Sequence, residues 1–143
     1  MKNSNKILYS VSGNIAKLTI NRPERRNALD AESLEQINIL MDEAESDEKV
    51  RVILITGQGD TFSSGFDLKD QMEKVPKGKQ WKPILELDHR TIMRFWNSPK
   101  PTIAAVRGAC LAGGFELSLA CDFTICSKDS FFGEPELKFG AGI

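Results

Sequence analysis

Hydrophobic residues alternate with more polar ones in two short stretches near the start of the chain, 7–11 and 16–20. Gly13 and Asn14 lie between the stretches, and these residue types favour the tight turns that join adjacent strands. A period of two on both sides of such a turn predicts a β-hairpin.

Beyond the hairpin, the hydrophobic positions take the period of a helix. Asp30 can cap a helix that carries Glu32 in its first turn and apolar residues at 3.6-residue spacing: Leu34, Ile37, Leu40, Met41 and Ala44. A second helix is expected over 84–97, where Ser98-Pro99-Lys100-Pro101 ends it.

Three further stretches are expected to be strands. Residues 50–56 (VRVILIT) form a nearly continuous apolar run, as expected of a strand covered on both faces. Residues 102–106 (TIAAV) are expected to form another buried strand, and 123–126 a last strand. The first two each lead into a glycine-containing loop, 57–65 and 107–114, and then into the start of a helix. The polar segment 71–80 is expected to be a surface loop.

The helix expected at 115–120 is apolar on nearly every side except at Glu116. A helix of that kind is normally buried, because it has no polar face to present to water. We therefore expect Glu116 to be a carboxylate within an apolar environment.

Composition makes the chain an ordinary globular domain. It has 143 residues, of which 41% are hydrophobic, and 11 glycines, so one domain over 1–143 is expected. The net charge of −1 and the lack of a basic cluster argue against a nucleic-acid partner. No leader or long apolar segment is visible, which predicts a soluble cytoplasmic protein without a membrane partner. The three cysteines, Cys110, Cys121 and Cys126, are expected to be reduced and buried.

The repeated strand–loop–helix units suggest a chemistry. Backbone N–H groups at a helix start lack intrahelical partners and attract negative charge. Two such starts, near Gly65 and Gly113, would form an oxyanion hole if they converged. Glu116 lies one turn beyond Gly113, and Glu136 is the candidate for a second carboxylate in an acid–base pair. The alternatives stay open: glycine suits any strand-to-helix turn, Glu116 suits any first helical turn, and Glu136 suits any turn.

Other site types fit less well. The loop 57–65 (GQGDTFSSG) has neither the GxGxxG spacing nor the GK[ST] ending of phosphate-binding loops. Its serines also miss the GxSxG pattern of serine hydrolases, because Thr61 stands at the first glycine position. His89, the only histidine, is expected to be a surface residue of a helix, so no metal site is predicted.

Four segments give the chain a family resemblance. They are 21–29 (NRPERRNAL), 61–68 (TFSSGFDL), 100–122 (KPTIAAVRGACLAGGFELSLACD) and 132–140 (FGEPELKFG). In this order they resemble the N-terminal part of the crotonase superfamily, the enoyl-CoA hydratase/isomerase family. The resemblance implies an α/β crotonase-like (ClpP/crotonase) spiral of repeated ββα units, without the C-terminal helices that family members use in trimerisation.

The resemblance also assigns roles to residues. It implies that the backbone N–H groups of Phe66 and Gly113 form the oxyanion hole and that Glu116 and Glu136 are the catalytic carboxylates. The residues expected to contact the CoA portion of the substrate are Ser64, Phe66, Asp67, Leu68, Lys69, Arg25 and Arg26. No separate cofactor is implied, because CoA is part of the substrate.

The implied reaction is the addition of water across the 2,3 double bond of an enoyl-CoA. Members that only isomerise usually keep the second acid alone, so the presence of both glutamates favours hydration. Isomerase, hydrolase and decarboxylase chemistry within the family remain alternatives, as does a truncated, non-catalytic module that binds an acyl-CoA or a partner. The full-length form is expected to be a homotrimer or hexamer in fatty acid metabolism. The length of the chain, about half that of family members, suggests truncation.

Overall fold

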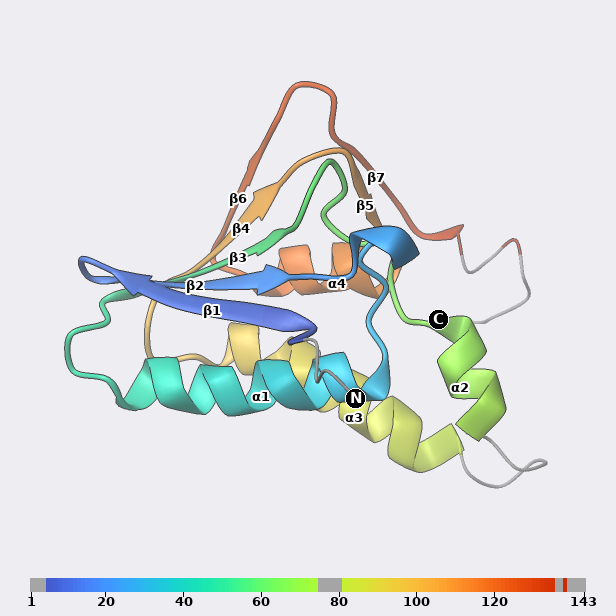
Figure 1. The fold of residues 1–143 in the computed structure, drawn as a ribbon, viewed down its shortest axis with the longest axis horizontal. Coiled ribbons are helices and arrows are strands. Elements are labelled where there is room, and N and C mark those ends of the chain that lie inside the picture. Colours follow the sequence, from blue (N-terminus) through green and yellow to red (C-terminus); the bar gives the residue numbers. More distant parts are fainter. Residues whose placement is uncertain (1–4, 75–80, 136–137, 139–143) are drawn as a thin grey trace.

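A computed structural model describes residues 5–74, 81–135 and 138. Figure 1 shows strands β1 to β7 and helices α1 to α4, together with a short 3-10 helix that leads into the first long helix. In chain order the elements are β1 (Ile7–Ser12), β2 (Ile15–Ile20), η1 (Pro23–Arg25), α1 (Ala31–Ser46), β3 (Val52–Gly57), α2 (Leu68–Lys74), α3 (Trp81–Trp96), β4 (Thr102–Val106), β5 (Ala109–Leu111), α4 (Gly113–Ala120), β6 (Phe123–Cys126) and β7 (Phe131–Gly133).

Five strands form one sheet in the order β1-β2-β3-β4-β6. The expected hairpin is present: β1 and β2 are antiparallel, with Ile7 opposite Ile20 and Gly13 in the left-handed region at φ +58°. Every later pair in this sheet is parallel. Parallel neighbours need a crossover connection, and helices α1, α3 and α4 supply it. The strands and helices thus repeat the unit that the sequence pattern predicted.

Helices α1, α3 and α4 lie on one side of this sheet, whereas α2 stands apart from them beyond the ends of the strands (Figure 1). In Figure 1, α1 and α3 run side by side below the strands, and α4 lies behind them against β4 and β6. The core between these layers consists of the inward side chains of β2 and β3 and the apolar stripe of α1, joined by aromatic and aliphatic residues of later segments. Its fully buried members include Leu18, Ile20, Ile53, Ile55, Leu34, Ile37, Met41, Phe62, Phe95 and Leu117.

Polar side chains satisfy backbone groups at both ends of helix α1. Asp30 adopts an extended conformation before the helix and accepts a hydrogen bond from the Ser33 N–H at 2.8 Å, as an N-cap should. At the other end Lys100 donates to the carbonyl oxygens of Ala44 and Asp47 at 2.8 and 2.7 Å. A cation there satisfies free carbonyl groups and complements the helix dipole.

Several expectations need correction. The segment 107–114 is not wholly a loop, since Ala109–Leu111 forms β5 and pairs in parallel with β7. Residues 71–74 belong to α2, and the rest of the expected surface loop, 75–80, lies outside the described residues. Strand β3 is fully buried on one face only, because its alternate residues are half-buried. Cys110 and Cys121 are buried and reduced as expected, but Cys126 is exposed because it lies on the outermost strand, β6.

No helix in the described ranges 5–74 and 81–135 is long and apolar enough to cross a lipid bilayer.

Candidate functional site

The two glycine-containing loops run next to each other in register. Ser63 and Cys110 form a parallel β-bridge, and the Leu111 N–H donates to the Ser63 carbonyl at 3.0 Å. Phe66 and Gly113 each lie three residues beyond the bridging pair. The register therefore brings together the two residues expected to supply the oxyanion-hole N–H groups.

Close backbone packing explains the glycines in these loops. Gly65 has φ +97°, and a Cβ there would overlap the Cβ of Ala112. A Cβ on Gly113 would lie 2.5 Å from the ring of Phe66, and one on Gly114 would lie 2.6 Å from the Cβ of Ser63. These distances are far below van der Waals contact, so the loops can approach only without side chains at these positions.

The N–H groups at the junction are available as donors. Gly113 is the first residue of α4, so its N–H has no intrahelical acceptor. Within the described part of the chain, neither the Phe66 N–H nor the Gly113 N–H donates a backbone hydrogen bond. Ala112, just before the helix, has φ +54° and ψ −135°, and its own N–H donates to the Gly133 carbonyl at 2.9 Å. The strained residue is thus held in place by β7.

Glu116 lies in the first turn of α4, where the sequence places it, but it is exposed. The expectation of a buried carboxylate was wrong, because α4 packs through one side only. Leu117 is fully buried, whereas Leu119, on the outer side, is 61% exposed. Glu116 lies near enough to Asp88 of helix α3 for its charge to help raise the pKa of Asp88. The second predicted carboxylate, Glu136, lies outside the described residues.

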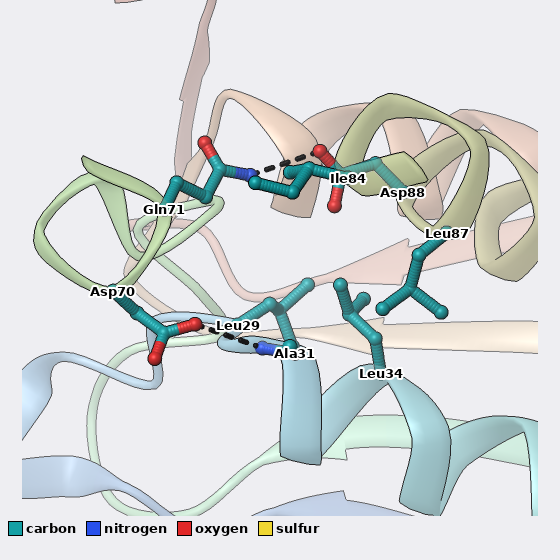
Figure 2. A pocket seen from close by; sticks show the side chains of 8 residues that line it. All are labelled: Leu29, Ala31, Leu34, Asp70, Gln71, Ile84, Leu87 and Asp88. Atoms are coloured by element: carbon teal, nitrogen blue, oxygen red, sulfur yellow. Dashed lines mark hydrogen bonds between the residues drawn. The ribbon is translucent and has the colours of Figure 1, made fainter. Parts of the chain in front are cut away.

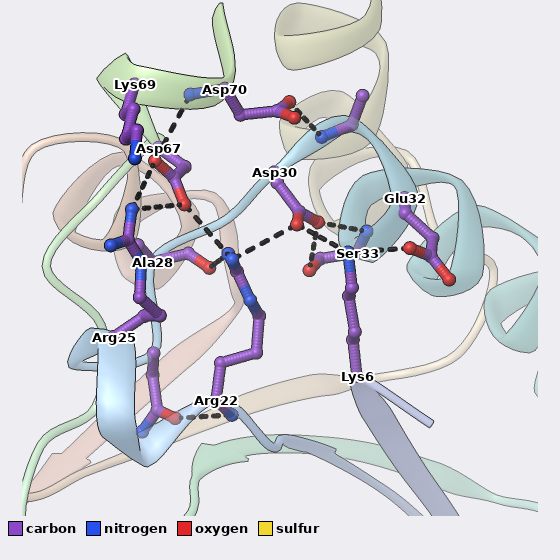
Figure 3. Close-up of polar contacts among 12 residues, drawn as sticks. Lys6, Arg22, Arg25, Ala28, Asp30, Glu32, Ser33, Asp67, Lys69 and Asp70 are labelled. Carbon is purple, nitrogen blue, oxygen red and sulfur yellow. Dashed lines mark hydrogen bonds and ion pairs between the residues drawn. The ribbon is translucent and has the colours of Figure 1, made fainter. Parts of the chain in front are cut away.

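A network of ion pairs fixes the segment that follows Phe66. Figure 3 shows Asp67 between two guanidinium groups, with Arg22 Nη2 at 3.1 Å and Arg25 Nη2 at 3.2 Å from its carboxylate oxygens. Burial alone would raise the pKa of Asp67, but the Asp70 N–H and the two arginines outweigh it and hold the pKa below its ordinary value. Arg22 also pairs with Asp30 at 3.1 Å, which links the start of α1 to the same network.

The residues expected to contact CoA lie around this network. Asp67 is only 5% exposed and is engaged with the arginines, whereas Leu68, Lys69 and Arg26 are exposed and Ser64 is half-buried. A polar hollow of about 220 Å³ adjoins them, lined by Arg22, Arg25, Asp30, Asp67, Lys69, Asp70 and Glu73. Arg22 was not among the site residues that the sequence singled out. CoA contact by the other residues stays a prediction.

Sequence reasoning also missed Asp88 and Gln71. Asp88 is 6% exposed and accepts a hydrogen bond from Gln71 Nε2 at 2.9 Å. The buried residues of α3 are Asp88, Thr91, Ile92 and Phe95, which follow helical spacing. This helical spacing puts Asp88 on the inner face of α3. It is the sequence signal from which the burial of Asp88 could have been predicted. His89, in contrast, is exposed as expected.

Comparison with known proteins agrees with this architecture. The family model described as enoyl-CoA hydratase/isomerase matches residues 10–142. The chain belongs to the enoyl-CoA hydratase/isomerase family. Its α/β fold is the crotonase fold, as a solved enoyl-CoA hydratase/isomerase from Xanthobacter autotrophicus Py2 shows: the identity is 61%, the TM-score is 0.94, and the match covers 96% of this chain and 52% of that one.

Two further members of the family illustrate its breadth. The enoyl-CoA hydratase structure from Bacillus anthracis is 30% identical with a TM-score of 0.87, over 96% of this chain and 55% of that chain. The short-chain-enoyl-CoA hydratase of Clostridium acetobutylicum is 33% identical over 138 residues, which are 95% of this chain and 52% of the relative. The chain therefore spans about half the length of the relatives it matches.

Proposed function

We propose that this chain carries the thioester-activating part of an enoyl-CoA hydratase site. The in-register pairing of the loops ending at Phe66 and Gly113 is the observation that supports this most directly. Two backbone donors that meet beside a helix N-terminus suit a carbonyl oxygen that gains negative charge during reaction. A conjugated thioester is such a group, because attack of water at its β carbon pushes an electron pair onto the thioester oxygen.

In the proposed mechanism the Phe66 and Gly113 N–H groups bind the thioester oxygen. One of the two glutamates, Glu116 or Glu136, takes a proton from water as the oxygen of that water bonds to the β carbon. The other glutamate delivers a proton to the α carbon, which restores the thioester and saturates the former double bond. Removing one donor from an oxyanion hole typically costs about 3–4 kcal/mol of transition-state stabilisation.

The exposed position of Glu116 is compatible with this role. Glu116 lies one turn beyond Gly113 on α4, and we place the acyl group along the side of the helix that carries it. Asp67, held by Arg22 and Arg25, fixes the segment that carries Phe66 and so supports the position of its N–H. Exposed Leu68, Lys69 and Arg26, together with Arg25 and Ser64, are proposed to contact CoA.

The test is the loss of ultraviolet absorbance when crotonyl-CoA is hydrated. Glu116→Gln and Glu136→Gln are each expected to lower kcat by at least about a hundredfold, because a general acid or base contributes that much. Glu48→Gln, which removes an exposed carboxylate beyond α1, serves as the control. Equal rates in all four proteins would refute the hydratase assignment. Binding of crotonyl-CoA without turnover would instead favour the non-catalytic acyl-CoA-binding alternative.

The product separates the family's other chemistries. An isomerase would move the double bond without adding water, and a hydrolase would release free CoA. A homotrimeric or hexameric assembly of the longer form and a role in cytoplasmic fatty acid metabolism are also part of the proposal. Sedimentation velocity on the longer form checks the assembly.

A further inference from the structure

A buried carboxylate lies beside a small cavity between α1, α2 and α3. The cavity has a volume of about 20 Å³ and is lined by Leu29, Ala31, Leu34, Asp70, Gln71, Ile84, Leu87 and Asp88. Most of these side chains are apolar. A space of this size holds one water-sized group.

Only one of the two Asp88 oxygens is satisfied. Oδ2 accepts the hydrogen bond from Gln71 Nε2 at 2.9 Å, whereas Oδ1 is buried and has no hydrogen-bond partner in the described part of the chain. In Figure 2 the Asp88 carboxyl group lies on the wall of the cavity, with its second oxygen directed toward the space above Leu29 and Leu34. A buried acceptor without a donor is costly, and native proteins rarely leave one unpaired.

The surroundings of Asp88 strengthen the need for a donor. Burial, the largest cause, and the charge of Glu116 together raise the pKa of Asp88 to about 6, although the Gln71 hydrogen bond acts to lower it. At neutral pH the carboxyl group is therefore mostly ionised. An ionised oxygen can only accept hydrogen bonds, so the complementary group must carry an O–H or N–H donor.

The cavity adjoins the candidate site through two connections. Leu29, in its wall, forms a β-bridge with Phe66, and the Leu29 N–H donates to the Gly65 carbonyl at 2.8 Å. Asp88 is close enough to Glu116 for that charge to act on it. One wall of the cavity is thus joined to the segment that carries the proposed oxyanion donor, and Asp88 lies within electrostatic reach of the proposed catalytic glutamate.

We infer that Asp88 ends the acyl subsite with an acceptor that binds a hydroxyl group on the acyl chain, so that the substrates are hydroxylated acyl-CoA thioesters. The volume of about 20 Å³ fits the terminal hydroxyl group alone, so the methylene groups that precede it would lie outside the cavity. A permanently bound water could satisfy the same oxygen. This inference rests on the proposed function, because it assumes that the acyl group of a CoA thioester enters here.

Calorimetric titration with saturated acyl-CoA pairs tests the inference without requiring catalysis. Each pair has four, six or eight acyl carbons and consists of the plain chain and the same chain with a terminal hydroxyl group. For at least one length the wild-type chain is expected to bind the hydroxylated member about tenfold more tightly, the usual value of a hydrogen bond to a charged group. Asp88→Leu is expected to abolish or reverse this preference.

Glu86→Leu is the matched control, because it replaces an exposed carboxylate on the same helix with the same side chain. It should keep the preference for the hydroxylated chain. Asp88→Asn preserves the size of the side chain and is expected to reduce the preference several-fold, which keeps the test informative if Asp88→Leu fails to fold.

Each contrary outcome has a distinct meaning. If plain and hydroxylated chains bind equally at every length, the inference is overturned and a permanent water or an empty cavity explains Asp88. A preference that survives in both Asp88 variants also overturns it. If no acyl-CoA binds at all, the proposed function fails and this inference fails with it.

Discussion

At the scale of single residues, the site depends on places where a side chain cannot fit. Gly65 combines φ +97° with a direct approach to Ala112, whereas Gly13 has φ +58° and open space around it. Both positions favour glycine for conformational reasons, but only Gly65 is also sterically closed. Substitutions at Gly65 and at Gly13 therefore separate the cost of backbone strain from the cost of close packing.

We expect Gly65→Ala to lower the free energy of unfolding by about 2–5 kcal/mol. This is the sum of the cost of placing alanine in the left-handed region and the cost of an overpacked contact. Gly13→Ala should cost only about 1 kcal/mol, because it adds the strain without the contact. Urea denaturation of both variants measures the difference. Similar losses in the two variants would mean that the loops can separate to admit a Cβ.

The buried carboxylate of Asp88 gives a second expectation. The folded-state pKa is raised to about 6, chiefly by burial, whereas an unfolded aspartate titrates near 3.9. The folded protein therefore holds this proton more tightly, and the associated stability is present below about pH 4 and is lost as the pH rises through about 6. Two other acids belong to its surroundings: Asp70 on α2 lines the same cavity, and the charge of Glu116 on α4 helps to raise the pKa of Asp88.

Asp88→Asn should consequently be more stable than the wild type at pH 7.5 by on the order of 1–3 kcal/mol, because its amide stays neutral. The advantage should disappear near pH 4, where Asp88 itself is protonated. Urea denaturation of both proteins across this range measures the gap. A gap that does not change with pH would show that burial does not shift the titration of Asp88.

Individual residues also show which contacts the sequence alone could predict and which it could not. The Asp30 cap was predictable, because its partner Ser33 is three residues away in sequence. The pairing of Asp67 with Arg22 joins residues from distant segments, and no local pattern specifies it. Glu116 was expected to be buried from the composition of its helix alone, but exposure depends on which side of α4 meets the sheet.

At the scale of elements, α1 and α3 are joined by both exposed and buried polar contacts. Arg94 pairs with Asp42 at 2.6 Å and Glu45 at 2.7 Å near the surface. In the interior, Asn38 Nδ2 donates to Thr91 Oγ1 at 2.9 Å, and both residues are buried. Surface ion pairs contribute little to stability, whereas a buried donor that loses its partner is costly.

We expect Thr91→Val to lower the free energy of unfolding by about 1–3 kcal/mol, since it leaves the buried Asn38 Nδ2 donor unpaired. Asn38→Leu should cost less, because the Thr91 hydroxyl still donates to the Leu87 carbonyl at 2.9 Å and the Asn38 amide oxygen has no hydrogen bond to lose in the described part of the chain. The double variant should cost less than the sum of the two, because both polar groups are then removed. Denaturant unfolding of all four proteins yields the coupling energy. Strict additivity would mean that the hydrogen bond between α1 and α3 contributes nothing.

Elements with a strong local signal were predicted well. The hairpin and α1 were predicted from periodicity, α3 from the residues that end it, and β4 and β6 as short strand segments. Strand β5 was missed, because three residues between glycines carry no period and become a strand only when β7 pairs with them. The register that brings Phe66 beside Gly113 is likewise a tertiary property, which the sequence supported only through two similar loops and a family resemblance.

At the scale of the whole molecule, the far edge of the sheet is apolar and exposed. Strand β6 pairs only with β4 among the described residues, and all four of its residues are exposed. Phe123 and Ile125 are 62% and 64% exposed, and Leu119 and Phe131 nearby are 61% and 56% exposed. An edge strand with unpaired backbone groups and apolar side chains is a template for pairing with another chain.

The 143-residue chain is accordingly expected to self-associate through β6 as its concentration rises. Ile125→Lys should weaken this association about tenfold or more, because a charged side chain on an edge strand opposes edge-to-edge pairing. Ile39→Lys is the matched control, since Ile39 lies on helix α1 rather than on a strand and, at 62% exposed, differs little from Ile125 in exposure. Sedimentation velocity over a range of concentrations measures both variants against the wild type. Equal weakening by the two substitutions would assign the association to net charge, and no association in the wild type would show that β6 does not pair between copies of this chain.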